Sequence, residues 1–375
     1  MTGHMPTTVY RMLWPKLRLP ITAALGFVIA SLAIGRLMPI AALAARPSTP
    51  TPFADTALWV NQVPIQETGQ ELVAAAAPAR VQALYVKAGD GSAAAAQFSP
   101  ALVSEIRSAG VTVCGWTFAY GLNPTAEAGV AVAAVRNGAQ CLVIDVEGQY
   151  DKLYGAAQLF VRTLRSQLGA RFPIGLASQA NVLQHPQFPY SVFLGPGAFN
   201  VVLPQMYWLD FGVSVDAAYA TTIGVNSIYG RPILPVGQLY HSPQSTELAR
   251  FRGLADAFGA RGWSFFDLDS AQPQALAALG APLPKPARKA IVAPTLHAGA
   301  DGDEIVQAQE LLNAAGARLP VGGFFGATTA RAVASFQLRH HLRPNGALTP
   351  ATWKDLLRFH PREPSWASGP PDSAR

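Results

Sequence analysis

The chain of 375 residues is poor in charge, in cysteine and in histidine, and each scarcity argues against a class of function. Charged residues make up only 13% of the sequence, and no cluster of lysine and arginine provides the basic surface that binding to a nucleic-acid backbone requires. Much of the net charge of +6 comes from basic residues in the N-terminal segment and in a proline-rich linker, because the region between them is mildly acidic. The sequence therefore predicts no nucleic-acid partner.

Histidine and cysteine are too scattered to predict a metal centre or a thiol active site. Of the seven histidines only His340 and His341 are adjacent, and no group of residues has the spacing of zinc ligands. Cys114 and Cys141 lie in apolar, strand-like runs with no histidine nearby, which argues against a cysteine nucleophile. They are either core residues or, outside the cell, partners in a disulfide. We expect neither a metal nor a cofactor.

The N-terminus has no uninterrupted apolar run of the roughly 20 residues that a membrane-spanning helix needs. Basic residues precede a shorter apolar run over residues 21–35, which continues to residue 45 and contains small residues near its end. This pattern is typical of an export signal, so we predict that residues 1–46 are a signal peptide. Retention as an N-terminal membrane anchor is the alternative, because an arginine near one end of the run can reach the interface.

Two proline-rich segments divide the rest of the chain. Proline stiffens and extends such segments, so the second one is predicted to act as a semi-rigid spacer between two domains. The tail at the C-terminus has a composition that predicts disorder. The predicted parts are a central domain over 52–281, a linker over 282–298, a C-terminal domain over 299–360 and the tail over 361–375.

Short apolar runs rich in Val, Ile and Leu recur eight times in the central region, with amphipathic stretches such as 100–109 and 153–168 between them. Runs of this kind are typical of parallel strands buried on both faces, and the intervening stretches fit crossover helices. We therefore predict an α/β fold in which eight such units close into a (β/α)8 TIM-like barrel. The predicted strands are 57–63, 81–87, 111–118, 141–147, 172–178, 200–207, 232–239 and 262–268.

Asp145 and Glu147 end the fourth predicted strand. Because side chains alternate along a strand, two residues that are two apart both point into the barrel. Two adjacent carboxyl groups raise one pKa and keep a proton near neutral pH, which a general acid for a glycosidic oxygen needs. The alternative is a structural pair satisfied by backbone amides or by a neighbouring Lys87 or arginine.

Polar and aromatic side chains also end the sixth and eighth predicted strands, where a barrel carries its active site. Gln205 and Tyr207 point inward and Trp208 follows in the loop, while Asp267 and Asp269 close the eighth strand. Sugar rings have apolar faces and polar edges, so such a mixture suits a polysaccharide. The residues predicted to bind substrate are Gln205, Trp208, Trp116, Lys87, Asp267 and Asp269.

Residues 301–357 contain three short helical patterns separated by glycine-rich turns. The predicted N-caps are Asp301 or Asp303, then Thr328 or Thr329, and finally Thr349, which Pro350 follows. The helical pattern alone also fits a generic three-helix bundle, but the turn residues are more specific. They form the blocks Gly-Asp, Gln-x-Leu-Leu, Phe-Gly-x-x-Thr, Ala-Val-x-x-Phe-Gln and Asn-Gly followed by Thr-Trp and Leu-Leu, in that order.

In these blocks the segment resembles the peptidoglycan-binding domain that is appended to many bacterial wall enzymes. The resemblance covers about one sixth of the chain. It implies adhesion to cell-wall polymer without chemistry of its own. Together with the N-terminal segment, it leads us to expect a secreted or extracytoplasmic protein associated with the cell wall.

The barrel carries a second resemblance. Asp145-x-Glu147, Gln205-x-Tyr207 and an aromatic eighth strand resemble chitinase-like (family 18) glycosidases. The sequence Val-Lys-Ala-Gly-Asp-Gly at 86–91, Asp145-Val-Glu147 and the closing Asp-Leu-Asp resemble lysozyme-like (family 25) muramidases. The chitinase-like resemblance implies that Glu147 is the acid, that Asp145 orients or stabilises the N-acetyl group of the substrate, and that Tyr207 donates a hydrogen bond to it. The N-acetyl oxygen would then be the internal nucleophile.

The chain departs from both patterns. Leu142 and Val143 stand where the chitinase pattern has further acidic residues, and strand one offers Trp59, Asn61 and Gln62 where the muramidase pattern has an aspartate. We predict an exported glycoside hydrolase-like protein that cleaves β-1,4 bonds in peptidoglycan or a related amino-sugar glycan. The alternative is a non-catalytic wall protein whose degenerate barrel binds glycan without cutting it.

Overall fold

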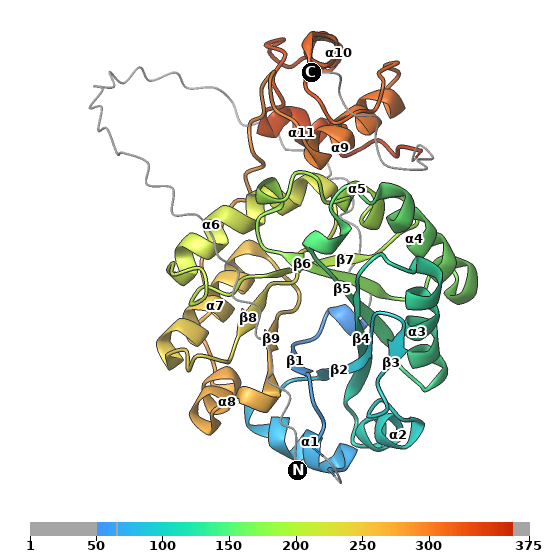
Figure 1. Ribbon diagram of the computed structural model, residues 1–375. Coiled ribbons are helices and arrows are strands. Elements are labelled where there is room, and N and C mark those ends of the chain that lie inside the picture. Colours follow the sequence, from blue (N-terminus) through green and yellow to red (C-terminus); the bar gives the residue numbers. More distant parts are fainter. Residues whose placement is uncertain (1–50, 65–66, 363–375) are drawn as a thin grey trace. The chain divides into compact units, whose positions relative to one another are not determined.

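The computed structural model describes residues 51–64 and 67–362 and contains a closed barrel followed by a small helical module (Figure 1). The predicted signal segment and most of the predicted tail lie outside these residues. Eight parallel strands pair in chain order, and β1 pairs with both β2 and β9 to close the ring. The strands are β1 (Ala57–Val60), β2 (Ala83–Asp90), β4 (Thr112–Ala119), β5 (Cys141–Val146), β6 (Ile174–Gln179), β7 (Val201–Gln205), β8 (Val236–Gln238) and β9 (Ser264–Phe266).

Each barrel strand lies within, or within three residues of, one of the eight predicted apolar runs, and the predicted TIM-like barrel is confirmed. The short strand β3 (Ala93–Ala94) pairs antiparallel with the end of β2. The helices around the barrel are α1 (Gly69–Ala76), α2 (Pro100–Ser108), α3 (Pro124–Arg136), α4 (Tyr154–Leu168), α5 (Tyr190–Phe193), α6 (Val215–Asn226), α7 (Ser245–Phe258) and α8 (Pro273–Gly280). Single 3-10 turns are η1 (Thr51–Phe53), η2 (Ala77–Ala79), η3 (Gly148–Tyr150), η4 (Val182–Gln184), η5 (Ser227–Tyr229) and η6 (Leu268–Ser270).

Alternation along the strands divides the apolar side chains into two clusters. On β1, Trp59 belongs to the cluster that fills the barrel, whereas Leu58 and Val60 belong to the cluster that packs against the helices. Cys114 and Cys141 face each other across β4 and β5 inside the barrel and form a disulfide, with their Cα atoms 4.5 Å apart. Both alternatives offered by the sequence therefore hold, since these cysteines are core residues and are also paired.

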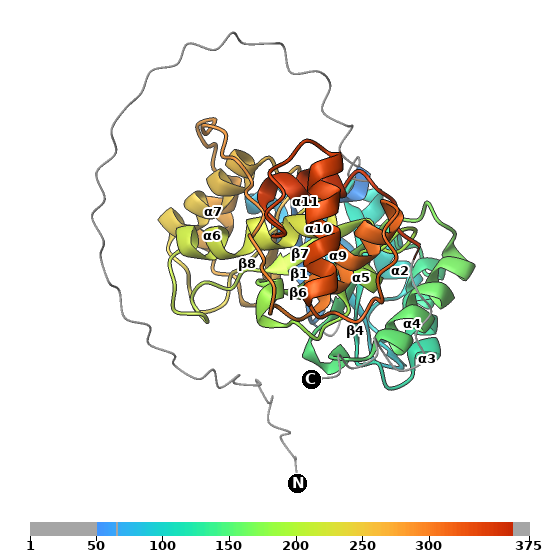
Figure 2. The ribbon, with the colours of Figure 1, turned by 90° about the horizontal axis from the view of Figure 1, so that it is seen from above.

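The C-terminal module consists of α9 (Asp303–Ala314), α10 (Ala327–Arg339) and α11 (Pro350–Leu356), which lie together in both views (Figure 1; Figure 2). Two glutamines hold its loops. The side chain of Gln309 accepts from the amides of Gly322 and Gly323 at 3.0 Å each, and that of Gln337 accepts from Gly346 N at 2.9 Å. The motif glutamines are therefore required by the glycine-rich turns that follow them.

The predicted helix caps are correct at one of three positions. Thr349 caps α11 by accepting from Thr352 N, and Pro350 is the first residue of that helix. Gly302 and Gly326 are the N-caps of the other two helices, so the predicted Asp and Thr caps there are wrong. At the start of α9 the carboxylate of Asp303 accepts hydrogen bonds from hydroxyl and amide donors of the barrel and none from the amides of its own helix that the structure records.

The proline-rich linker lies against the barrel. Lys289 N donates to Ala257 O on α7 at 2.8 Å, and Arg288 Nη1 donates to Asp256 O at 3.0 Å. At its end, Pro294 O accepts from Trp353 Nε1 of α11 at 3.1 Å. The segment therefore does not act as the extended spacer that its prolines predict, because its polar backbone groups find partners on both folded parts.

Candidate active site at the C-terminal end of the barrel

Asp145 and Glu147 lie at the C-terminal end of β5. Cys141 and Val143 of this strand belong to the cluster inside the barrel, so the alternation places Asp145 on the same inward face. Asp145 is only 8% exposed, whereas Glu147, one residue beyond the strand, is partly exposed. Glu147 is thus the carboxyl group of the pair that solvent and a ligand can reach.

Gln205 connects this pair to β7. Its Nε2 donates to Asp145 Oδ1 at 2.7 Å, and its side chain also lowers the pKa of Glu147 through a hydrogen bond. Gln205 is the last residue of β7 and is partly buried, so the strand itself positions the amide. An amide placed here binds the ionised form of either carboxyl group without adding charge.

Burial dominates the electrostatics of the two acids. It raises the pKa of Asp145 well above its usual range, and the charge of Glu147 raises it further, against lowering by Gln205 and Lys87. Burial also raises the pKa of Glu147. Since burial and a close carboxylate both disfavour ionisation, each acid of the pair keeps its proton to a higher pH than it would in water.

Lys87 lies near the acids but has partners of its own. Its Nζ is 2.9 Å from Asp90 Oδ2 and 5.0 Å from the centre of the Trp116 ring. Tyr120 Oη also donates to Asp90, at 2.7 Å. Because Lys87 is engaged by Asp90, it acts on Asp145 through its charge and not through a direct hydrogen bond that the structure records.

A chain of aromatic rings runs from the barrel interior to its C-terminal end. Phe266 lies 6.2 Å from Trp116, 6.3 Å from Tyr207 and 6.3 Å from Tyr240, measured between ring centroids. We call the rings of Trp116, Phe266, Tyr207 and Tyr240 the aromatic wall. Trp116 lies at its buried end, since it is 3% exposed and donates from Nε1 to Val60 O. Tyr207 is partly exposed, and burial raises its pKa well above the usual range, which keeps its hydroxyl protonated.

Trp208 is not brought to the acids. It is completely buried on the other face of the chain, where its ring lies 5.5 Å from that of Phe251 and its Nε1 donates to Glu247 Oε1 at 3.2 Å. Tyr207 and Trp208 are neighbours in sequence and therefore point in opposite directions. The geometry gives Trp208 a packing role between the barrel and α7.

Asp267 and Asp269 both bind backbone at the end of β9. Asp267, which is 7% exposed, accepts hydrogen bonds from the amide and hydroxyl of Ser270. Asp269 accepts from Asn61 N at 3.3 Å and from Gln62 N at 2.5 Å, and burial raises its pKa to about 6. Asp269 thereby joins the loop after β1 to the end of the barrel, close to the aromatic wall.

Sequence reasoning missed Gln179, the last residue of β6, and the contact that Tyr240 and His241 after β8 make with Asp210 after β7. Tyr240 Oη donates to Asp210 Oδ2 at 2.6 Å, and His241 Nδ1 lies 3.0 Å from Asp210 Oδ1. Gln179 pairs in register with Gln205, and its Nε2 is buried without a hydrogen-bond partner among the described residues. The Ser-Gln ending of β6, the fifth predicted strand, was the available signal for Gln179, whereas nothing local in the sequence pairs Asp210 with Tyr240.

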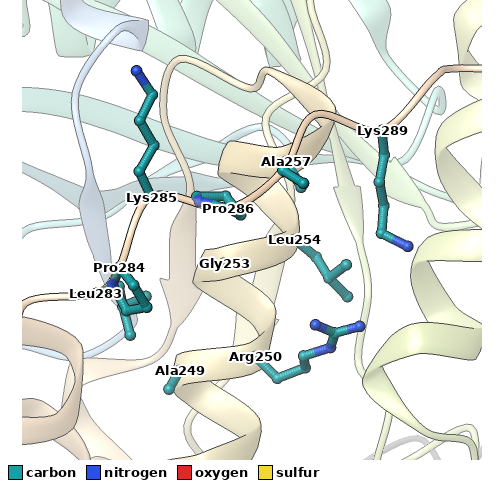
Figure 3. Close-up of a pocket in the computed structure, with 11 residues that line it drawn as sticks. Ala249, Arg250, Gly253, Leu254, Ala257, Leu283, Pro284, Lys285, Pro286 and Lys289 are labelled. Carbon is teal, nitrogen blue, oxygen red and sulfur yellow. The ribbon is translucent and has the colours of Figure 1, made fainter.

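A cavity of about 340 Å³ lies elsewhere, between α7 and the linker (Figure 3). Leu254 and Pro286 contribute to its apolar lining, and Arg250 and Lys289 extend beside Leu254 in the close-up. Arg250 is held by Asp216. None of the residues that line this cavity is a carboxylic acid, so it does not offer the chemistry found at the end of the barrel.

Among residues 51–64 and 67–362, no group of three or more His, Cys, Asp and Glu residues could hold a metal ion. None of the helices described is both long enough and apolar enough to cross a membrane.

The comparisons with known proteins give separate matches for the barrel and for the C-terminal module. Residues 301–356 match the family described as "Putative peptidoglycan binding domain". A peptidoglycan-binding protein from Clostridioides difficile, solved with glutamine hydroxamate, is 35% identical, with a TM-score of 0.17. The match covers 17% of this chain and 41% of that protein, so this chain spans less than half of its length.

The barrel has only distant likenesses. A chitinase from Chromobacterium violaceum is 12% identical over 60% of this chain and 98% of its own, with a TM-score of 0.41. The modular autolysin LytC from Streptococcus pneumoniae is 12% identical over 39% of this chain and 37% of its own, with a TM-score of 0.31. None of the curated proteins matches the chain. These values carry no argument about chemistry; the chain is a TIM-like barrel joined to a C-terminal segment that matches the peptidoglycan-binding family.

Proposed function

We propose that the protein is an extracytoplasmic cell-wall glycoside hydrolase that cleaves β-1,4 bonds of N-acetylated amino-sugar polymer, with residues 301–356 as its wall anchor. The observation that carries the catalytic part is the grouping of Asp145, Gln205 and Glu147 at the C-terminal end of the barrel, with the pKa of both acids raised. The family match supports the anchor, and the disulfide between Cys114 and Cys141 supports an oxidising compartment.

In the proposed reaction Glu147 is the general acid, because it is the more exposed carboxyl group of the pair. It donates its proton to the glycosidic oxygen while the N-acetyl oxygen of the same sugar ring attacks its own anomeric carbon and the glycosidic bond breaks. Asp145 orients the N-acetyl group, and Tyr207 donates a hydrogen bond to it. Water then attacks the anomeric carbon of the cyclic intermediate, and Glu147 takes the proton from that water.

The aromatic wall supports a sugar substrate. The rings of Tyr207 and Phe266 are partly exposed and can lie against the apolar face of a pyranose, while Gln205 and the acids meet its polar edges. Lys87 and Asp267 border this region and would contribute charge to it. Trp208 is left out of the proposed site because it is completely buried on the side of the chain opposite to Tyr207.

The second candidate function is glycan binding without cleavage. Two observations favour it: Asp145 already accepts a hydrogen bond from Gln205, and β1 places the apolar Trp59 inside the barrel where the muramidase pattern has an acid. In that case the same wall and amide would hold a sugar chain, but no proton would be transferred.

The release of reducing ends from purified peptidoglycan and from chitin oligomers separates the two functions. We expect Glu147→Gln to abolish release while retaining binding of the oligomers, and Asp256→Asn, an exposed acid on α7, to behave as the unchanged chain. Activity in Glu147→Gln equal to that of the unchanged chain would disprove the role of Glu147. Binding without release in all three proteins would establish the non-catalytic function.

The anchor is tested separately by sedimentation with purified walls. Phe324, in the turn before α10, is 45% exposed, so its ring is free to lie against the apolar face of a sugar. We expect Phe324→Ser to weaken wall binding, and Leu122→Ser, at an 87% exposed position on the barrel, to leave it unchanged. Equal sedimentation of both variants would remove Phe324 from the proposed anchor.

A further inference from the structure

The helical layer of the barrel is thin between α4 and α6. In the connection from β6 to β7 the α-helix α5 has only four residues, whereas the neighbouring helices α4 and α6 have 15 and 12 residues. Helix α9 of the C-terminal module lies next to α5 and η5 at this place (Figure 1). Ile305 and Leu311 of α9 belong to the same apolar cluster as Phe193 and Tyr229 of the barrel. The core of the barrel therefore continues into the module.

Asp303 is the central polar contact of this junction. It is the first residue of α9 and is only 1% exposed. Its Oδ1 accepts from Tyr154 Oη at 2.8 Å and from Ser191 Oγ at 2.6 Å. Its Oδ2 accepts from Ser191 N at 2.7 Å and from Tyr229 Oη at 2.8 Å. Four neutral donors from three separate barrel elements therefore converge on one carboxylate.

The backbone around Asp303 is fixed to the same place. Asp303 N donates to Pro186 O at 2.6 Å, so the residue both donates to and accepts from the barrel. A side chain at Gly302 would bring a Cβ within 2.7 Å of the Cβ of Pro186, and Gly302 has a φ of 141° that favours glycine. The Gly-Asp pair that begins the family motif thus serves, in this chain, as the contact with the barrel.

We propose that Asp303 is a latch that locks the wall-binding module onto the barrel, so that the two parts move as one rigid body and not as domains on a flexible tether. The partner surface is the set of donors on Tyr154, Ser191 and Tyr229, next to the short helix α5. Wall polymer bound by the module would then be held at a fixed position relative to the end of the barrel. The inference goes beyond the proposed reaction, because it holds for a barrel that only binds glycan.

Replacing the carboxylate by an amide isolates the latch. In Asp303→Asn one oxygen becomes an NH2 group that cannot accept, so at least two donors are left facing a donor in a buried place. The matched control is Asp301→Asn, because Asp301 belongs to the same motif but is exposed. Tyr154→Phe and Tyr229→Phe test the same bonds from the barrel side, since each removes one hydroxyl and keeps the ring.

Distances between spin labels at Ser166→Cys on α4 and Arg331→Cys on α10 report the docking directly, since both positions are exposed. We expect a single narrow distance distribution in the unchanged chain and in Asp301→Asn. Asp303→Asn should broaden it, and the double variant Tyr154→Phe/Tyr229→Phe should do so even if Asp303→Asn fails to fold. Distributions that stay narrow in every folded latch variant would overturn the proposal.

Hydrogen exchange at one amide provides an independent readout. Ser191 N–H donates to Asp303 Oδ2, so its exchange should accelerate by about tenfold or more in Asp303→Asn, the factor that corresponds to loss of a typical hydrogen bond. Asp301→Asn should leave this amide protected. Unchanged protection of Ser191 in Asp303→Asn would also refute the latch. Neither measurement depends on hydrolysis, so failure of the catalytic proposal leaves this test intact.

Discussion

The side-chain amide of Gln205 reaches Asp145 although a whole strand lies between them. Gln205 is on β7 and Asp145 on β5, and their side chains meet at 2.7 Å on the inner side of β6. The residue of β6 that pairs in register with Asp145 is Ala177, whose methyl group is small. Because a larger inward-facing residue at that position would fill this space, the contact depends on alanine there as well as on the two polar residues.

This contact predicts how the pKa of Asp145 responds to loss of the amide. The hydrogen bond from Gln205 lowers that pKa, whereas burial raises it. We therefore expect Gln205→Leu to raise the pKa of Asp145 further, because the carboxylate loses a hydrogen bond that favours its ionised form. Carbon-13 NMR of the aspartate carboxyl groups measures this shift without any need for activity. Gln187→Leu, at an exposed position, is the control, and a lower pKa in Gln205→Leu would contradict the assignment.

The neighbours Tyr207 and Trp208 should differ in what their replacement affects. Trp208 is completely buried, so Trp208→Phe should lower the free energy of unfolding by about 1–3 kcal/mol through lost packing and loss of the indole hydrogen bond to Glu247 Oε1. The affinity of the Trp208→Phe variant for chitin oligomers should stay unchanged. Tyr207→Phe removes only a hydroxyl at the end of the barrel, so it should weaken binding or turnover with little effect on stability.

Urea unfolding and oligomer titration of the two variants check this division. If Trp208→Phe lost affinity at full stability, the packing role derived from its position would be wrong. Tyr207→Phe provides the matched comparison, because the two residues are adjacent and each replacement leaves a phenylalanine.

The barrel could be predicted because its signals are local. Eight apolar runs at regular spacing indicate buried parallel strands, and strand alternation alone places Asp145 inside the barrel. The same alternation separates Tyr207 from Trp208, but the prediction grouped Trp208 with the site because it assumed that the strand had already ended. The strand does end at Gln205, yet the opposite directions of the two side chains persist into the loop.

Contacts between distant segments could not be predicted. Asp210 and Tyr240 meet because the loops after β7 and β8 fold toward each other, and neither residue carries a motif. The role of Asp303 was also hidden, because an aspartate before a helix normally predicts an N-cap. Its actual donors, Tyr154 and Tyr229, lie 149 and 74 residues away in the sequence.

The disulfide inside the barrel predicts a dependence of stability on redox conditions. Cys114 and Cys141 are 27 residues apart. A crosslink that closes a loop of this length stabilises a fold by about 3–4 kcal/mol, because it lowers the conformational entropy of the unfolded chain. We expect the double variant Cys114→Ala/Cys141→Ala to unfold at a lower urea concentration than the oxidised protein. A reductant should lower the midpoint of the oxidised protein toward that of the variant once unfolding exposes the bond. Equal midpoints for variant and oxidised protein would show that the disulfide contributes nothing to stability.

The junction at Asp303 predicts how docking of the module depends on pH. Burial raises the pKa of Asp303 from 3.8 to about 6, which outweighs the hydrogen bonds that favour its ionised form. Burial, followed by the charges of Asp303 and Asp301, raises the pKa of Glu304 from 4.5 to about 8. The titratable groups around this pair are Tyr154 on α4, Tyr190 on α5, Tyr229 on η5 and Asp301 just before α9, and Glu310 on α9 acts on Tyr154 through its charge.

Both acids hold protons more tightly when docked than when exposed, so the docked state binds more protons. Its stability is therefore greatest below about pH 4 and falls as the pH rises, first through about 6 as Asp303 ionises and then through about 8 as Glu304 ionises beside it. The tyrosines do not add charge in this range, because burial raises each pKa above its usual value.

Spin-label distances measured between pH 4 and pH 9 follow this change, and we expect the distribution to broaden as the pH rises. Glu304→Gln should remove the broadening that occurs near pH 8 and leave the broadening near pH 6, because only Asp303 then titrates. Asp301→Asn should move the broadening near pH 8 to a slightly lower pH, since it removes one of the charges that raise the pKa of Glu304. A distribution that narrows toward alkaline pH would mean that the four hydrogen bonds outweigh burial, and that the docked carboxylate of Asp303 prefers to be ionised.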